Sequence, residues 1–311
     1  MIAQPRLSPD ASAMPPGLDP LRKLCAQTDG AFFIETDHHL LAYLPGADRL
    51  VVTFDNLSSD REVEDRQPFA DMLVRGQGWA ILGVMVKRKD WFQCQHLKAQ
   101  MLLLQEAGLF SRYENVSFYG SSMGAFGAAA FAPVAPGCTV LALAPQSTLD
   151  GSVAPFEGRY RYGARLGDWS APFNDAAVGI KSAGLAYVIY DPQVAEDHQH
   201  ALRLAGPSAM LLPVPHLTHK IPPMFKRMEV LKEVATEGLT GRLQPLGFRI
   251  LMRKRRAAVP YLLTMINAAV AKGHFTLAER AVNRALELVP NWKLRKLSKD
   301  VAAARKHAET R

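Results

Sequence analysis

The chain contains little cysteine and no long apolar run. Only three of its 311 residues are cysteine, at positions 25, 94 and 138, and no two of them form a CxxC pair. Three cysteines cannot all pair, so a disulfide-stapled mini-protein is excluded and we expect a reducing, cytoplasmic location. No stretch approaches the roughly 18–20 uninterrupted apolar residues of a transmembrane helix, so none is predicted.

A secretory signal is also missing from the beginning of the sequence. The first twenty residues contain five prolines and no continuous apolar stretch of seven residues. We therefore interpret residues 1–22 as a flexible leader rather than a signal peptide. The whole chain is 48% hydrophobic and 21% charged, which excludes a disordered protein and suits a large domain with an appendage.

Positive charge is unevenly distributed. The net charge of +8 divides into 17 Lys/Arg against 22 Asp/Glu over residues 1–219, a balance of −5, and 20 against 7 over residues 220–311, a balance of +13. This asymmetry predicts two parts with different roles, a mildly acidic domain and a basic tail.

The middle of the chain alternates strand and helix patterns. Helices are expected at about 66–75, 91–107, 123–132, 195–205 and 223–236. Strands are expected at 31–35, 40–44, 50–54, 79–86, 116–119, 139–143, 185–190 and 210–214, the first two as an antiparallel hairpin. Several of these runs are apolar on both faces, as in VVTF and AILGVMV, which is typical of parallel strands covered on both sides. The pattern predicts an α/β protein with a mainly parallel sheet over residues 23–236.

A nucleophile motif follows one of these strands. Gly120-Ser121-Ser122-Met123-Gly124 fits G-x-S-x-G, with the buried run 116–119 before it and an alanine-rich helix pattern after it. The pentapeptide alone has roughly a one-in-ten chance of occurring in a chain of this length. Its position between strand and helix is what indicates a strained turn that exposes the Ser122 hydroxyl.

A catalytic serine needs a base, and the base needs an orienting acid. Asp191 directly follows the strand at 185–190 and is the preferred acid, while Asp197, six residues on, is the alternative. His219 lies on the loop after the next strand and is the preferred base, with His216 as the alternative. Oxyanion donors are expected from the amide of Met123 and from Asn56 or its neighbour in the turn that follows the strand at 50–54.

With these residues in this order, residues 31–235 resemble the α/β-hydrolase superfamily. The resemblance implies an α/β-hydrolase-like sheet flanked by helices and a Ser–His–Asp triad made by Ser122, His219 and Asp191. It does not imply a substrate, because that fold serves many reactions. The HGGG oxyanion motif of the hormone-sensitive lipase group is absent.

Two further segments stand out. Residues 145–184 are rich in Gly, Pro and aromatics, and a connection this long is expected to cover the site as an insert or lid. Residues 237–311 are expected to be an all-helical, basic tail. Within it Gly273, Phe275, Ala278, Val282, Ala285 and Pro290 follow the spacing of a tetratricopeptide (TPR) repeat, so a single TPR-like unit is predicted at about 260–289, docked on the domain or on another chain.

The predicted function is a serine-dependent acyl hydrolase, of esterase or thioesterase type, or an acyltransferase. It needs no cofactor or metal, since HExxH, paired CxxC and a GxGxxG after a strand are missing.

The cluster of Arg159, Arg161 and Arg165 with Tyr160 and Tyr162 favours an anionic or sugar-bearing ester as substrate. The alternative is an inactive hydrolase-like scaffold whose tail binds a protein or glycan partner, or a second copy. Nucleic acid is not expected as a partner, because the basic run at 253–256 lacks any recognised binding signature.

Overall fold

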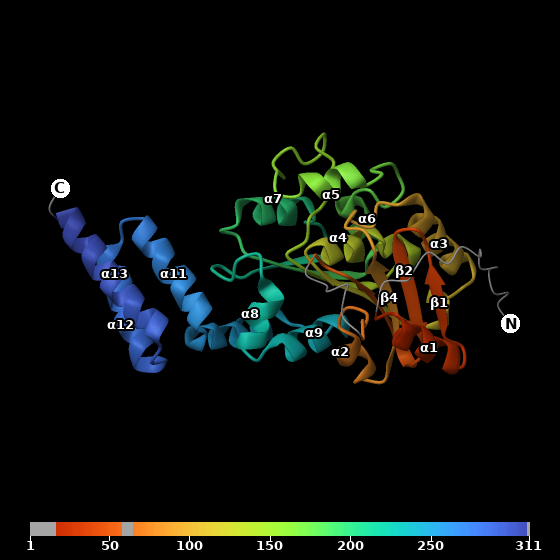
Figure 1. Ribbon diagram of the computed structural model, residues 1–311, viewed down its shortest axis with the longest axis horizontal. Helices are drawn as coiled ribbons and strands as arrows, with labels where there is room; N and C mark the ends of the chain where they lie inside the picture. Colours follow the sequence, from red (N-terminus) through yellow and green to blue (C-terminus); the bar gives the residue numbers. More distant parts are fainter. Residues whose placement is uncertain (1–16, 58–64, 310–311) are drawn as a thin grey trace.

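The computed structural model describes residues 17–57 and 65–309, and an eight-stranded sheet forms its centre (Figure 1). The strands follow the order β1-β2-β4-β3-β5-β6-β7-β8, in which β2 pairs antiparallel with β1 and β4, and every other neighbouring pair is parallel. Their bounds are β1 Phe32–Glu35, β2 His39–Leu44, β3 Ala47–Phe54, β4 Trp79–Val86, β5 Asn115–Ser121, β6 Thr139–Leu143, β7 Leu185–Tyr190 and β8 Ala209–Pro213. All eight expected strands are present, the first two as the expected hairpin.

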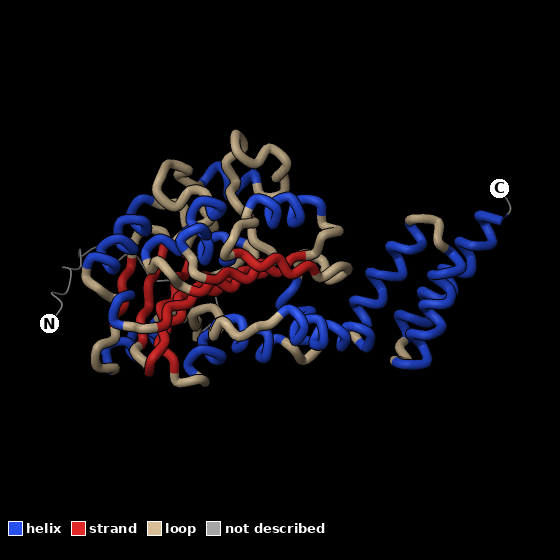
Figure 2. Tube along the Cα trace, turned by 180° about the vertical axis from the view of Figure 1, so that it is seen from behind, coloured by secondary structure: helices blue, strands red, loops and turns tan. Residues whose placement is uncertain are grey.

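Helices cover both faces of the sheet, which is why the central strands are apolar on both sides. One face packs against α1 (Asp19–Gln27), α2 (Asp71–Arg75), α8 (Ile221–Arg227) and α9 (Leu231–Leu239). The other face packs against α3 (Gln95–Glu106), α4 (Met123–Ala130), α6 (Ala176–Gly179) and α7 (Ala195–Arg203). Figure 2 shows the sheet lying between these two layers. The expected fold class, an α/β-hydrolase-like, mainly parallel sheet with a helical appendage, is confirmed.

The end of the predicted leader, residues 1–22, overlaps a helix. Residues 1–16 lie outside the described part, but α1 already begins at Asp19. Leu18, Leu21 and Cys25 are buried against the sheet, so the boundary predicted at residue 22 falls inside this helix. Helix α2 begins later than expected, at Asp71, and the expected helix at 223–236 is divided into α8 and α9.

The C-terminal helices extend away from the sheet (Figure 1). The connection runs through α10 (Pro245–Leu251) and the 3-10 segment η4 (Met252–Ala257). It leads to three successive helices, α11 (Val259–Ala271), α12 (Phe275–Leu288) and α13 (Trp292–Glu309), with Ala278, Val282 and Ala285 buried between them. The expected helical hairpin is therefore present, and its TPR-like character stays a prediction. No helix in the described ranges combines the length and apolarity that crossing a membrane requires.

The segment between β6 and β7 lies on the same side of the sheet as α4 and α7 (Figure 1). It contains α5 (Arg161–Leu166), α6 and the 3-10 turn η3 (Ile180–Ser182), joined by irregular loops. This segment is the predicted insert at 145–184, and two of its side chains reach the candidate site described next.

Candidate active site

Ser122 stands on a sharp turn between β5 and α4. Its backbone has φ 53° and ψ −120°, a conformation that a residue with a Cβ rarely adopts. The turn is held at one end by the Ser122 amide, which donates to Leu143 O of β6 at 2.8 Å. The glycines on either side permit it, because a Cβ on Gly120 would lie 2.1 Å from the Gly124 backbone, and one on Gly124 would lie 2.4 Å from Phe54 O.

The base expected from the sequence lies beside this serine. His219 Nε2 is 2.8 Å from Ser122 Oγ, and the loop that carries it follows β8. His216, the alternative, has positive φ and places its Nε2 3.1 Å from the Gln193 side-chain amide, with its ring against Tyr261. His216 therefore contacts the neighbouring loop and α11 instead of the serine.

The acid differs from the preferred assignment. His219 Nδ1 donates to Asp197, at 2.8 Å from Oδ2 and 3.0 Å from Oδ1, and Asp197 is wholly buried in the first turn of α7. Asp191 instead accepts the amides of Gln193, at 2.9 Å, and Thr218, at 2.6 Å. The expected Asp191–His219 pair is thus corrected to Asp197–His219. Asp191 holds the two loops together because it lies at the end of β7, one turn before α7 begins.

The insert reaches the site through Tyr160 and Arg159. Tyr160 Oη lies 3.1 Å from His219 Nε2, and its ring packs against Trp91. Arg159 donates to Asp197 Oδ1 at 2.8 Å and forms a bidentate pair with Glu157. The sequence placed Arg159 among candidate substrate contacts, but here its guanidinium is engaged by two carboxylates and neutralises the acid beside His219.

A buried chain of polar groups extends this network behind the acid. His200 Nε2 donates to Glu157 Oε2 at 3.0 Å, and its Nδ1 accepts the Ser147 amide at 3.0 Å. Burial alone would raise the pKa of Glu157, but hydrogen bonds from His200 and Arg159 outweigh it and hold that pKa at about 2. The first half of the insert is thereby tied to α7 and, through Asp197, to the Ser–His–Asp group. Sequence spacing offered no signal for these contacts, since they join residues about forty positions apart.

One expected oxyanion donor, Met123, follows the serine in the chain, and the other, Asn56, lies in the turn after β3. Met123 is the first residue of α4, so its amide has no acceptor within the helix and belongs to the donors that a helix N-terminus leaves open. Asn56 follows the end of β3, whose last carbonyls approach Gly124 closely. The structure thus brings the end of β3 against the elbow, and the donor role of Met123 and Asn56 stays a prediction.

Comparison with known proteins yields structural similarity only. No protein-family model matches the chain, and no curated protein matches it significantly. The capsule O-acetyltransferase of Neisseria meningitidis serogroup A is 13% identical, with a TM-score of 0.45 over 71% of this chain and 99% of that one. An esterase from Pyrococcus furiosus is 17% identical, with a TM-score of 0.43 over 78% and 98%. A hyperthermophilic esterase from Pyrobaculum calidifontis is 15% identical, with a TM-score of 0.45 over 72% and 90%. Similarity at this level specifies neither substrate nor reaction.

Proposed function

We propose that this protein is a serine-dependent acyl-transfer enzyme, either an esterase-type or thioesterase-type hydrolase or an acyltransferase. The observation that carries the proposal is the continuous line of contacts from Ser122 Oγ through His219 to Asp197, with 2.8 Å at each step. A nucleophile, a base within hydrogen-bond reach and a buried acid that orients the base are the three parts that such chemistry requires.

In the proposed reaction Ser122 Oγ attacks the carbonyl carbon of an ester or thioester. His219 Nε2 removes the hydroxyl proton and then transfers it to the leaving alcohol or thiol, which leaves an acyl group on the serine. A water molecule, or the hydroxyl of an acceptor in an acyltransferase, attacks this acyl-enzyme with His219 again as base. Asp197 keeps the proton on Nδ1 and stabilises the imidazolium that forms in each step.

The tetrahedral intermediates carry a negative oxygen that needs donors. We assign this role to the Met123 amide, assisted by the positive end of α4, and to Asn56 in the loop after β3. The hydroxyl of Tyr160 lies beside the same histidine nitrogen as the serine does, so Tyr160 forms one wall of the space in which the substrate carbonyl is held.

The proposed substrate is an anionic or sugar-bearing ester. Arg159 no longer supports this proposal, because Glu157 and Asp197 engage it. Arg161 and Arg165 still do: both are exposed on α5, the helix that directly follows Tyr160. Arginines exposed next to the site are suited to bind a carboxylate or a phosphate.

A fluorophosphonate probe tests the proposal, because it reacts covalently with an activated serine. We expect wild-type protein to be labelled once, and labelling to be lost in Ser122→Ala and His219→Ala. Ser121→Ala is the matched control, since Ser121 is the neighbouring buried serine of the same turn and its removal should leave labelling intact. Labelling that persists in Ser122→Ala would overturn the assignment. No labelling of the wild type would favour the inactive scaffold.

The two enzyme classes differ in what accepts the acyl group. With an activated acetyl ester, a hydrolase releases acetate at a rate that added alcohols or sugars do not change. An acyltransferase instead forms the acetylated acceptor, which mass spectrometry identifies, and its acetate release falls as the acceptor concentration rises.

A further inference from the structure

A second group of reactive side chains lies away from Ser122, where the hairpin strand β2 meets the loop after β4. His39, the first residue of β2, is wholly buried, and its Nε2 lies 3.0 Å from Oδ1 of the equally buried Asp90. Arg88 donates to the other oxygen of Asp90 at 3.1 Å. Cys94 follows on the same loop and is the N-cap residue of the twelve-residue helix α3. The thiol of Cys94, the imidazole of His39, the carboxylate of Asp90 and the guanidinium of Arg88 thus belong to one cluster.

The second nitrogen of His39 is available to the thiol. Nδ1 is buried, and within the described residues it has no hydrogen-bond partner of good geometry. Cys94 is nevertheless a group that acts on this ring: its interaction with His39 is the main cause that lowers the Cys94 pKa, and amides at the start of α3 contribute. Burial would lower the pKa of His39, but Asp90 and Cys94 outweigh it and raise that pKa. Both shifts favour a thiolate beside an imidazolium.

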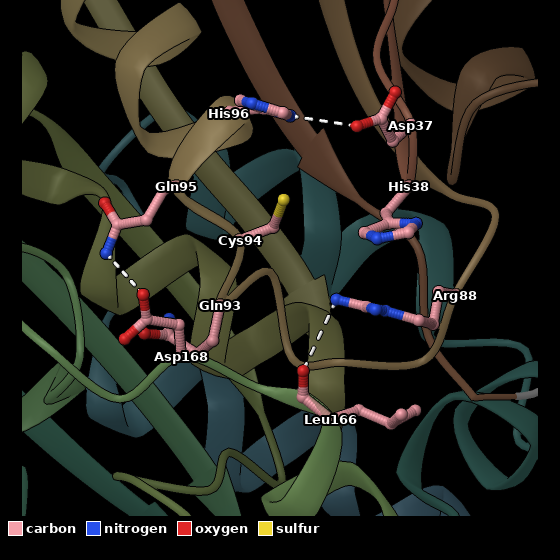
Figure 3. Close-up of a pocket in the computed structure, with 9 residues that line it drawn as sticks. All are labelled: Asp37, His38, Arg88, Gln93, Cys94, Gln95, His96, Leu166 and Asp168. Atoms are coloured by element: carbon pink, nitrogen blue, oxygen red, sulfur yellow. Dashed lines mark hydrogen bonds and ion pairs between the residues drawn. The ribbon is translucent and has the colours of Figure 1, made fainter.

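Cys94 is one wall of a cavity of about 200 Å³. Figure 3 shows its sulfur pointing into the space between His96 and His38. The cavity is lined by charges of both signs, Arg88 together with Asp37 and Asp168, and by His38 and His96. His96 and Asp37 form an ion pair whose side chains are 68% and 70% exposed, so the cavity opens to solvent at that side.

The other two cysteines lack all of these features. Cys25 lies on the buried face of α1, and its burial is the main cause that raises the pKa of its thiol to about 11. Cys138 is buried before β6, and burial raises its pKa to about 12. Neither belongs to a group of titratable side chains around a cavity, so the chain contains two internal controls for the reactivity of Cys94.

We propose that Cys94 is a site of S-thiolation, at which a thiolate held by His39 and Asp90 accepts a low-molecular-weight peptide disulfide. The Cys94 sulfur attacks one sulfur of the disulfide, a new S–S bond forms and the original S–S bond breaks. The released thiolate takes a proton from water, so no additional oxidant or reductant is required.

The cavity favours this class of ligand. A small peptide thiol carries an ammonium group, and the lining presents the carboxylates of Asp37 and Asp168 to it, while Arg88 is already bound by Asp90. A peroxide would need neither the volume nor charges of both signs. The adduct would also lie beside the insert, because Arg88 and Lys98 donate to backbone carbonyls between residues 166 and 170 of that segment.

The test uses the folded full-length protein with glutathione disulfide at pH 7, followed by intact-mass and peptide analysis. We expect one glutathione per chain, on Cys94, formed at least tenfold faster than any adduct on Cys25 or Cys138. Cys94→Ser should then carry none. An adduct that appears on Cys25 or Cys138 at the same rate, or none at all, would overturn the proposal.

Cys94 is only 9% exposed and is reached through the cavity. Access through the cavity alone could make it react before Cys25 and Cys138, and the pH dependence separates such access from activation of the thiol. The rate of alkylation by iodoacetamide should reach its plateau well below the midpoint of about 8.5 for a free thiol. A rate that is still rising at pH 8.5 would overturn the proposal. His39→Gln should shift the midpoint upward and slow the reaction at pH 7 by roughly tenfold. Asp90→Asn offers a second variant if His39→Gln does not fold, and the wild-type profile is decisive without either. None of these readouts depends on Ser122, so they do not share an outcome with the probe experiment.

Discussion

Asp197 Oδ2 lies 2.8 Å from His219 Nδ1, although Asp197 belongs to a helix and not to the end of a strand. The carboxylate lies in the first turn of α7, where the partial positive charge of the helix N-terminus stabilises it. Arg159 contacts the other oxygen at 2.8 Å. The carboxylate is therefore stabilised by the helix N-terminus and by Arg159 while it accepts the hydrogen bond from His219. This arrangement fixes the carboxylate and, through it, the plane of the imidazole.

Replacing Asp197 and Asp191 in turn distinguishes the acid that orients His219 from the aspartate that holds the loops after β7 and β8 together. Asp197→Asn should lower kcat by roughly 10³–10⁴-fold, because an amide can hold the histidine in the wrong tautomer. Asp191→Asn should change kcat far less and should destabilise the fold by about 1–3 kcal/mol, since it weakens the bonds to the amides of Gln193 and Thr218. Steady-state kinetics and urea unfolding of both variants check this, and equal losses of kcat would contradict the assignment.

The choice between these two aspartates could not be made from the sequence. Both follow β7 within a few residues, and chain order alone indicates only that an acid belongs there. What decides is the course of the backbone: the chain turns directly after Asp191, where the side chain bonds to Gln193 N, and α7 then carries Asp197 back toward His219. That turn depends on the loop after β8, which is distant in sequence.

More of the fold than of the site could be predicted, because the spacing of apolar residues along a strand or helix is a local signal. The eight strands, the glycine-flanked elbow and the hairpin all come from patterns of fewer than ten residues. Contacts made by the insert are different in kind. Glu157, Arg159 and Tyr160 meet α7 and His219 only after an irregular segment has folded over the sheet, and no periodicity describes such a path. The Cys94–His39–Asp90 group was missed because the pairing of β2 with β4 brings together residues that are 51 positions apart.

Glu157 makes the stability of the protein dependent on acid pH. Its folded pKa of about 2 lies below the ordinary value of 4.5, so its contribution is complete above about pH 5 and is lost as the pH falls toward 2. Glu157→Gln should therefore reduce the free energy of unfolding by a few kcal/mol at pH 6, and the difference from wild type should vanish near pH 2. Urea unfolding between pH 6 and 3 measures this trend.

A matched control for that experiment is Glu287→Gln. Glu287 pairs with Arg284 on α12, but both side chains are more than half exposed, so the pair contributes little. Its replacement should leave unfolding unchanged at every pH. A difference between Glu157→Gln and wild type that stays constant from pH 6 to 3 would show that ionisation of Glu157 is not what stabilises the insert.

Close packing at the elbow predicts a strong dependence on Gly124. A Cβ added there would lie 2.4 Å from Phe54 O and 2.8 Å from Asp55 O, and backbone atoms cannot move away as a flexible side chain can. We expect Gly124→Ala to lower the free energy of unfolding by about 3 kcal/mol and to reduce probe labelling. Gly151→Ala is the control, because a Cβ there meets nothing within 4 Å, and it should change stability by less than about 0.5 kcal/mol.

The strained backbone of Ser122 predicts a difference between two inactive variants. Ser122→Ala and Ser122→Gly both remove the hydrogen bond to His219, and both should lose labelling. Alanine keeps a Cβ at φ 53°, ψ −120°, a strain of about 1–3 kcal/mol, whereas glycine adopts that conformation freely but loses more chain entropy on folding. The glycine variant should therefore be the more stable by about 1 kcal/mol in thermal or urea unfolding. Equal stability of the two, or a more stable alanine variant, would mean that the turn stores no strain at this residue. The Ser122 hydroxyl would then owe its position to the flanking glycines alone.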